Sequence, residues 1–127
     1  MYDLIEKALS MKNWAVVGAT QNTSKFGYRV YKKLKNHNYG VFPVNPQYQD
    51  IEGTRCYSHL RDIEERIEAV SMVINPVKGL EMLQEAENKD IKIIWCQPGA
   101  ESEEIIDFAK SKGIDIIYNE CLLVELG

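Results

Sequence analysis

The stretch Trp14-Ala15-Val16-Val17-Gly18-Ala19-Thr20 decides the fold. Its apolar part ends on a glycine, and the polar loop Gln21-Asn22-Thr23-Ser24 follows. A short apolar run between turn residues is typical of a buried parallel strand. Beyond the loop, Phe26, Val30 and Leu34 stand at helical spacing. We therefore predict a strand, a tight loop and a helix, the first part of a nucleotide-binding βαβ unit.

The junction between this strand and this helix suits an anionic ligand. Ser24 or Thr23 is the expected N-cap of the helix. A helix N-terminus offers unpaired N–H groups and the positive end of the helix dipole to a phosphate. Gly18 lets the backbone come close to that phosphate.

The rest of the chain alternates between segments typical of helices and of strands. Such alternation predicts a doubly wound, Rossmann-like α/β fold in which helices cover both faces of a five-stranded parallel sheet. We expect one single domain over residues 1–127. The expected helices span 2–12, 25–37, 60–66, 78–88 and 101–111, the strands 14–17, 41–44, 69–74, 91–96 and 114–118, with a loop at 47–58 and a closing segment at 119–125.

Polar or glycine-bearing turns follow four of the predicted strands. In parallel sheets ligands bind beyond the carboxyl ends of the strands, near the point where the strand order reverses. We therefore expect one binding edge, formed by Gly18-Ala19-Thr20, Asn45-Pro46, Asn75-Pro76 and Gln97-Pro98-Gly99.

Charge is distributed unevenly along the chain. The net charge is −4, but residues 7–49 hold seven lysines and arginines and no acid. This cationic half suits a small anionic ligand. For Lys32, Lys33 and Lys35 the competing interpretation is a solvated helix face. Nucleic acid is not expected, because no aromatic motif accompanies the basic residues and the whole chain is acidic.

Several classes of protein are not indicated by the sequence. The N-terminus lacks the pattern of a signal peptide, and no apolar run reaches membrane-spanning length, so we expect a cytoplasmic protein that binds no membrane. The three cysteines, Cys56, Cys96 and Cys121, show neither a disulfide framework nor a zinc motif. No residue cluster has the spacing of a metal site, and His37 and His59 are expected to be solvated or locally bonded.

The usual dinucleotide fingerprint is absent as well. No Gly-x-Gly-x-x-Gly follows the first strand, and the second strand ends in Val44-Asn45 where an NAD-binding protein carries an acid. An acid there would repel a phosphate, so its absence argues against NAD and leaves NADP open, although no arginine follows the second strand. A Walker A loop is also absent. An NADP-dependent or other nucleotide-using enzyme therefore remains an alternative.

Several motifs together resemble a known family. The chain is similar to the small, stand-alone coenzyme A-binding domain proteins and to the N-terminal domain of the succinyl-CoA synthetase α subunit, from about residue 12 to residue 125. The motifs are Val16-Val17-Gly18-Ala19-Thr20, Phe26-Gly27, Val41-Phe42-Pro43-Val44-Asn45-Pro46, Ile51-Glu52-Gly53, Trp95-Cys96-Gln97-Pro98-Gly99-Ala100-Glu101-Ser102 and Asn119-Glu120-Cys121-Leu122.

The resemblance implies coenzyme A or an acyl-CoA as ligand, with three groups of contacts. It implies that a pyrophosphate cradle is formed by Gly18, Ala19, Thr20, Ser24, Phe26 and Gly27, with Lys25 or Arg29 neutralising phosphate charge. Adenosine contacts would come from Asn45 and Pro46, with Ile74, Asn75 and Pro76 at the next strand end. Gln97 and Gly99 would lie toward the pantetheine arm.

Binding without catalysis is the expected function, with a role in sensing, carrying or delivering the ligand. The related synthetase reaction needs a phosphorylated histidine in a second domain and an ATP-grasp partner, and neither fits in 127 residues. A CoA-binding subunit of a larger ligase is a further alternative. The acyl group stays open, as does a homodimer or another protein partner. Cys96 is expected to be buried and inert, although a mixed disulfide with a thiol ligand is conceivable at its position.

Overall fold

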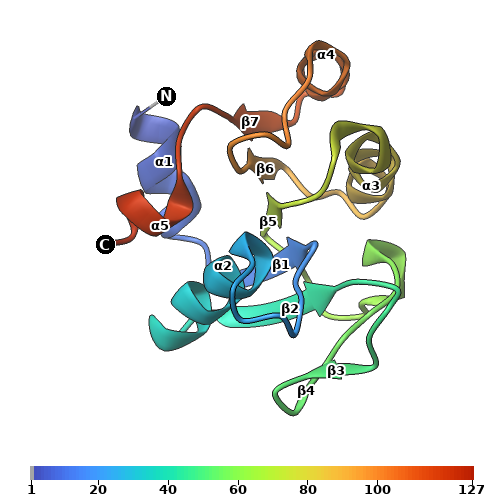
Figure 1. Cartoon of the computed structure of the whole chain (residues 1–127). Helices are drawn as coiled ribbons and strands as arrows, with labels where there is room; N and C mark the ends of the chain where they lie inside the picture. Colours follow the sequence, from blue (N-terminus) through green and yellow to red (C-terminus); the bar gives the residue numbers. More distant parts are fainter. Residues whose placement is uncertain (1) are drawn as a thin grey trace.

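The structure is a computed structural model that describes residues 2–127. The described residues form five α-helices and seven strands, and five of the strands make up the main sheet (Figure 1). The helices are α1 (Tyr2–Leu9), α2 (Phe26–Asn36), α3 (Pro76–Asn88), α4 (Glu103–Ser111) and the short α5 (Leu122–Glu125). The strands are β1 (Asn13–Val17), β2 (Gly40–Val44), β3 (Asp50–Ile51), β4 (Thr54–Arg55), β5 (Ala69–Met72), β6 (Ile93–Cys96) and β7 (Asp115–Ile117).

The main sheet is parallel throughout, in the order β2-β1-β5-β6-β7. The first strand, β1, therefore lies inside the sheet, and β2 follows on one side of it as the edge strand. The chain then crosses to the other side of β1, where β5, β6 and β7 are added in turn. This arrangement confirms the predicted five-stranded, Rossmann-like α/β fold. The order reverses between β1 and β5, which places the expected ligand crevice at the carboxyl ends of these two strands.

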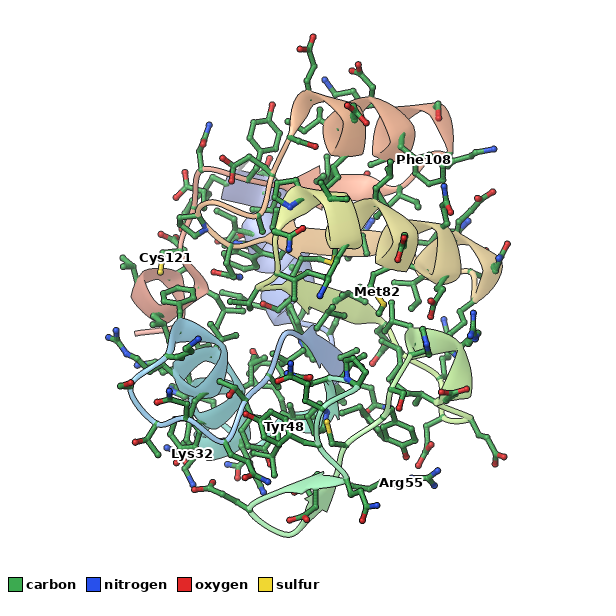
Figure 2. All side chains as sticks on the ribbon, turned by 45° about the vertical axis from the view of Figure 1, so that its right-hand side comes forward. Lys32, Tyr48, Arg55, Met82, Phe108 and Cys121 are labelled. Atoms are coloured by element: carbon green, nitrogen blue, oxygen red, sulfur yellow. The ribbon has the colours of Figure 1, made fainter. Side chains whose placement is uncertain are left out.

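Alternate residues of each strand enter two different cores. In β1, Trp14 and Val16 join the core under α1, α2 and α5, whereas Ala15 and Val17 join the core under α3 and α4. All four side chains are buried, which explains why β1 is a continuous apolar run rather than an alternating one. Figure 2 shows Met82 of α3 and Phe108 of α4 on the side of the sheet opposite Cys121, at the start of α5.

Residues 47–58 are more structured than the predicted loop. β3 and β4 form a small antiparallel hairpin in which Asp50 pairs with Arg55. Glu52 and Gly53 form its turn, with φ values of 50° and 82°. The hairpin is fastened to α2, because the Tyr28 hydroxyl and the Lys32 ammonium both donate to the Glu52 carboxylate, at 2.7 Å and 3.0 Å.

Element boundaries account for the other differences from prediction. The helix predicted over 60–66 is only a single 3₁₀ turn at Leu60–Asp62. The strand predicted over 69–74 ends at Met72, and the helix predicted from 78 begins at Pro76. Asn75 caps that helix by accepting the Lys78 N–H, and proline is favoured at the first helical position. The helix predicted over 2–12 ends at Leu9, and the strand predicted over 91–96 begins at Ile93.

β2 forms one outer edge of the sheet and is covered over its carboxyl half. The Tyr57 N–H donates to the Pro43 carbonyl oxygen at 2.9 Å, and the Asn45 N–H donates to the Tyr57 carbonyl oxygen at 2.8 Å. Pro43 itself has no N–H to offer.

No helix within residues 2–127 combines the length and the apolar character needed to cross a bilayer.

Candidate functional site

Three adjoining cavities lie along the carboxyl edge of the sheet. The central cavity has a volume of about 430 Å³ and lies between the loop before α2 and the turn after β2. It is lined by Gly18, Thr20, Asn22, Lys25, Phe26, Gly27, Asn45, Gln47, Tyr48, Val73 and Ile74. This lining includes residues from two of the four turns that the sequence predicted to converge, Gly18-Ala19-Thr20 and Asn45-Pro46.

The other two cavities share walls with the central one. A cavity of about 300 Å³ opens toward β2 and α3, and it shares Gly18, Asn45 and Ile74 with the central cavity. A third, of about 230 Å³, opens toward the end of β6 and shares Phe26 and Ile74. The three cavities therefore adjoin one another, and together we call them the edge groove, with a central part, an α3 arm and a β6 arm.

Gly18 closes the inner wall of the edge groove in a conformation that favours glycine. Its φ is +96°, and its N–H donates to the Val44 carbonyl oxygen at 2.9 Å. A Cβ atom at this position would lie 2.5 Å from the Val73 carbonyl oxygen and 2.7 Å from Ile74 Cγ2. Only glycine therefore lets β1 turn this tightly against the end of β5.

Asn45 ties the turn after β2 to the glycine loop. Its side-chain amide donates to the Ala19 carbonyl oxygen at 2.8 Å, while its side-chain oxygen accepts the Gln47 N–H at 2.9 Å. A second link joins the Thr20 and Tyr48 hydroxyls, 2.9 Å apart. Two walls of the groove are thus held in place without a ligand. Sequence reasoning missed Gln47 and Tyr48, although both stand directly after the predicted turn at Asn45.

The start of α2 carries no side-chain cap among the described residues, so the expected cap by Ser24 or Thr23 is wrong. Lys25 occupies the N-cap position. The Ser24 hydroxyl and N–H both donate to the Asn22 side-chain oxygen, at 2.7 Å and 3.1 Å, which is a local turn that competes with capping. The first turn of α2 also contains no acid. Its first N–H groups and its positive dipole end are therefore free to meet an anion at the groove.

The basic residues of the N-terminal half have different surroundings. Lys25 lines the central part of the groove. Arg29 is exposed and lines none of the three cavities. Lys32 pairs with Glu52, and the Lys35 ammonium donates to the Tyr31 and Thr54 hydroxyls at 3.0 Å and 2.8 Å. Lys32 and Lys35 thus hold the β3–β4 hairpin against α2 as well as facing solvent.

Gln97 does not lie in the groove. It is fully buried, its amide donates to the Ser71 hydroxyl at 3.1 Å, and its side-chain oxygen accepts the Leu122 N–H at 3.0 Å. Gln97 thus joins β5, the end of β6 and α5. Its neighbour Gly99, like Asn75, lines the β6 arm.

The remaining candidates are placed as follows. Pro46 lines the α3 arm, whereas Ala19, Ser24 and Pro76 line none of the three cavities. Ala19 still shapes the groove through the carbonyl oxygen that Asn45 binds.

Nucleophilic and metal chemistry find little support in the structure. Cys96 is fully buried, and burial, with a smaller effect of the Glu101 charge, raises the pKa of its thiol to about 12. Burial also raises the pKa of Cys56. The His59 ring lies within hydrogen-bond distance of the Glu85 carboxylate of α3, at 2.9 Å, so its partner is distant in the sequence. Within residues 2–127 no three His, Cys, Asp or Glu side chains are grouped as a metal ion requires.

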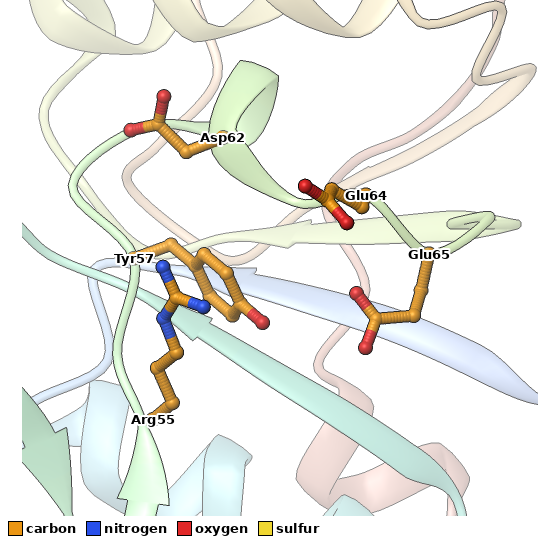
Figure 3. Close-up of a pocket in the computed structure, with 5 residues that line it drawn as sticks. All are labelled: Arg55, Tyr57, Asp62, Glu64 and Glu65. Atoms are coloured by element: carbon orange, nitrogen blue, oxygen red, sulfur yellow. The ribbon is translucent and has the colours of Figure 1, made fainter.

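A separate hollow of about 340 Å³ lies beside β4 and the 3₁₀ turn (Figure 3). The Arg55 guanidinium lies over the Tyr57 ring, 4.6 Å from its centroid, and Asp62, Glu64 and Glu65 complete the lining. This hollow shares no lining residue with the edge groove. Its three carboxylates against one arginine make it unsuited to a polyphosphate.

Comparison with known proteins assigns the chain to a family. Residues 12–127 match the model of a family described as "CoA binding domain". The match confirms the resemblance noted in the sequence, and it covers all the elements that form the edge groove.

Similar proteins include a curated enzyme and two solved structures. The "Acetate--CoA ligase [ADP-forming]" of Methanocaldococcus jannaschii is 31% identical over 119 residues, which cover 87% of this chain but only 17% of the ligase. A conserved hypothetical protein from Pyrococcus furiosus is 37% identical with a TM-score of 0.87, over 91% of this chain and 99% of that one. A hypothetical protein from Pyrococcus horikoshii is 32% identical with a TM-score of 0.92, over 98% and 87% of the two chains.

Proposed function

The chain belongs to the CoA binding domain family, and on this premise we propose that it binds coenzyme A or an acyl-CoA non-covalently in the edge groove. Three features support the proposal: a groove of three connected cavities, an uncapped helix start facing it, and a lysine on its wall. The observation that carries it is the start of α2, which offers free N–H groups and Lys25 beside Gly18. This is the arrangement that a pyrophosphate needs.

The two arms differ in the charged residues that line them, and this difference suggests which end of the ligand each arm binds. The α3 arm has apolar walls from Val44, Pro46 and Met82, and its charged side chains are a cation, Lys78, and an acid, Glu81. The β6 arm is lined by no lysine or arginine of residues 2–127. Because the adenosine half of coenzyme A carries a further phosphate and the pantetheine half carries no charge, we place the adenosine in the α3 arm and the pantetheine in the β6 arm.

Asn45 favours this ligand over NAD. NAD-binding proteins place a carboxylate at the end of the second strand to bind the ribose hydroxyls. Here that position holds a neutral amide, already engaged with Ala19 and Gln47. A neutral residue accepts a phosphorylated ribose, which coenzyme A and NADP share, so these two ligands have to be compared directly.

A role as the CoA-binding part of a larger ligase is the second candidate. The chain spans 17% of the Methanocaldococcus ligase that it resembles. If this chain serves such an enzyme, it works together with the domains that make up the rest of the ligase, and copurification from its native source should recover them. Otherwise the groove acts alone, and sensing or carrying acyl-CoA is the function that needs no further domain.

Calorimetric titration tests the proposal. The purified protein is first denatured and examined by mass spectrometry for a carried-over ligand, and is then titrated with coenzyme A, dephospho-coenzyme A, NADP and NAD. We expect coenzyme A to bind most tightly and dephospho-coenzyme A more weakly. A ligand-free sample that gives no heat with coenzyme A, or that prefers NADP, would refute the proposal.

A further inference from the structure

We propose that the β6 arm selects acyl-CoAs whose acyl group is short and uncharged, and that it rejects acyl groups ending in a carboxylate. The inference rests on the proposed function, since it concerns the thiol end of the same ligand. It is carried by the lining of the β6 arm, by the position of Glu101, and by the way the nearby helix starts are capped.

The lining of the β6 arm is almost entirely apolar. Its cavity of about 230 Å³ is formed by Phe26, Val73, Ile74, Asn75, Pro98, Gly99 and Ala100. Asn75 is the only polar side chain among them, and its oxygen already accepts the Lys78 N–H at 3.0 Å. A carboxylate placed here would lose water and find only the neutral Asn75 amide as a side-chain donor, whereas a methyl or branched alkyl group would gain apolar contact.

Glu101 adds a negative charge beside this cavity. Its carboxylate accepts the N–H of Gly99, a lining residue, at 3.0 Å. The next turn, at the start of α4, holds Glu103 and Glu104. The lysines that line the edge groove, Lys25 and Lys78, lie on its central part and on its α3 arm. A second carboxylate in the β6 arm would thus meet like charge with no cation on the arm's wall to offset it.

The starts of α3 and α4 do not offset the repulsion. The N–H groups at a helix start would favour an anion if they were free. At α3 the cap is Asn75 and the first residue is Pro76, which has no N–H. At α4 the Ser102 hydroxyl accepts the Ile105 N–H, and two acids fill the first turn. Lys25, at the N-cap of α2, lines the central part of the edge groove and is absent from the wall of the β6 arm.

The test compares acyl-CoAs that differ in charge but little in size. The protein is titrated with coenzyme A, acetyl-CoA, isobutyryl-CoA, malonyl-CoA and succinyl-CoA in one buffer. We expect acetyl- and isobutyryl-CoA to bind within about threefold of coenzyme A, and malonyl- and succinyl-CoA to bind at least about tenfold more weakly. Equal affinity for acetyl- and succinyl-CoA would overturn the inference.

A pair of variants assigns the effect to Glu101. Glu101→Gln removes the charge but keeps an oxygen that accepts the Gly99 N–H, and it should reduce the penalty on succinyl-CoA at least about threefold with acetyl-CoA unchanged. Glu64→Gln removes an acid from the separate hollow beside β4 and should leave all five affinities as they were. An unchanged succinyl-CoA penalty in Glu101→Gln would reject the role of Glu101.

The same titrations separate this inference from the proposed function. Coenzyme A has no acyl group, so its binding reports on the groove alone. If coenzyme A does not bind, the proposed function fails first. If coenzyme A binds and the charged acyl-CoAs bind equally well, only the selectivity fails.

Discussion

Gly27, in the first turn of α2, lies against Gly18, at the end of β1: a methyl group placed on the Gly27 α carbon would strike the Gly18 carbonyl oxygen. The start of the helix and the end of the strand therefore touch through backbone atoms. Phe26 and Gly27 both line the central part of the edge groove, so this close approach holds the start of α2 at the groove.

Gly27→Ala should accordingly impair binding more than other glycine replacements in helices. The added methyl group forces α2 away from β1, at a cost of about 1–3 kcal/mol in folding stability, and displaces the helix start from the phosphates. Gly79→Ala is the matched control, because the new methyl group in α3 would meet only the flexible ends of Ile105 and Met72, at 3.1 Å each. Thermal unfolding and coenzyme A titration of both variants check this. Equal losses in the two would contradict the assigned role of Gly27.

Lys25→Ala should weaken coenzyme A binding by about 1–2 kcal/mol, because it removes a charge-assisted hydrogen bond to a phosphate. Arg29→Ala, one helical turn further on, should change binding by less than about 0.5 kcal/mol, since Arg29 is exposed and lies outside the groove. Calorimetry at two salt concentrations measures both effects, and the loss of Lys25 should also flatten the salt dependence. A larger loss of coenzyme A affinity in Arg29→Ala than in Lys25→Ala would show that the phosphates bind nearer to Arg29.

Asn45→Asp should reduce coenzyme A affinity at least about tenfold, because it puts a negative charge at the groove and removes the donor to the Ala19 carbonyl oxygen. Asn45→Ala removes the same hydrogen bond without adding charge and should cost less. The difference between the two titrations isolates the repulsion of phosphate. Binding of NAD gained by Asn45→Asp would show that this position also decides between nucleotides.

Glu68 should make folding stability depend on pH in the acid range. Its carboxylate accepts the N–H groups of Asn13 and Lys12, at 3.1 Å and 3.0 Å, and these bonds lower its pKa. Because the pKa is lower in the folded chain than in the unfolded one, the stabilisation is complete above the unfolded value and is lost as pH falls through the folded value. Glu68→Gln should therefore cost less than about 1 kcal/mol at pH 7 and nothing at pH 2. Urea unfolding of both proteins at the two pH values measures the difference.

Cys96 should resist thiol reagents in the folded protein at pH 8, because its buried thiol, with a pKa raised to about 12, is almost entirely protonated. Cys121 is only half-buried and should react first. Peptide mapping after brief alkylation, with and without urea, distinguishes the two cysteines. Rapid labelling of Cys96 without urea would contradict this prediction and would support the alternative that Cys96 forms a mixed disulfide with a thiol ligand.

The sequence was most informative where one short segment determines its own structure. The apolar run 14–17 followed by Gly18 predicts β1 and its turn correctly, because both burial and the positive φ are local requirements. The β3–β4 hairpin was missed because two-residue strands are too short to show a period, even though Glu52-Gly53 is a recognisable turn.

The candidate site was harder to predict than the fold. The choice between Lys25 and Arg29 depends on where α2 begins, and the local turn at Asn22 and Ser24 shifts that start from its expected position. Gln97 was placed correctly at a strand end, but its burial depends on α5 packing over it, 25 residues further along the chain. Such contacts are set by tertiary structure and leave no periodic signal.

The covered edge of β2 limits how copies of this chain can associate. Tyr57 occupies the Pro43 carbonyl oxygen that an incoming strand would need, and Pro43 cannot donate in return. Two copies therefore cannot continue their sheets through the carboxyl half of β2 without first displacing the segment that carries Tyr57. This edge is protected against strand-by-strand aggregation, and a dimer that uses it would have to form through side chains rather than backbone ladders.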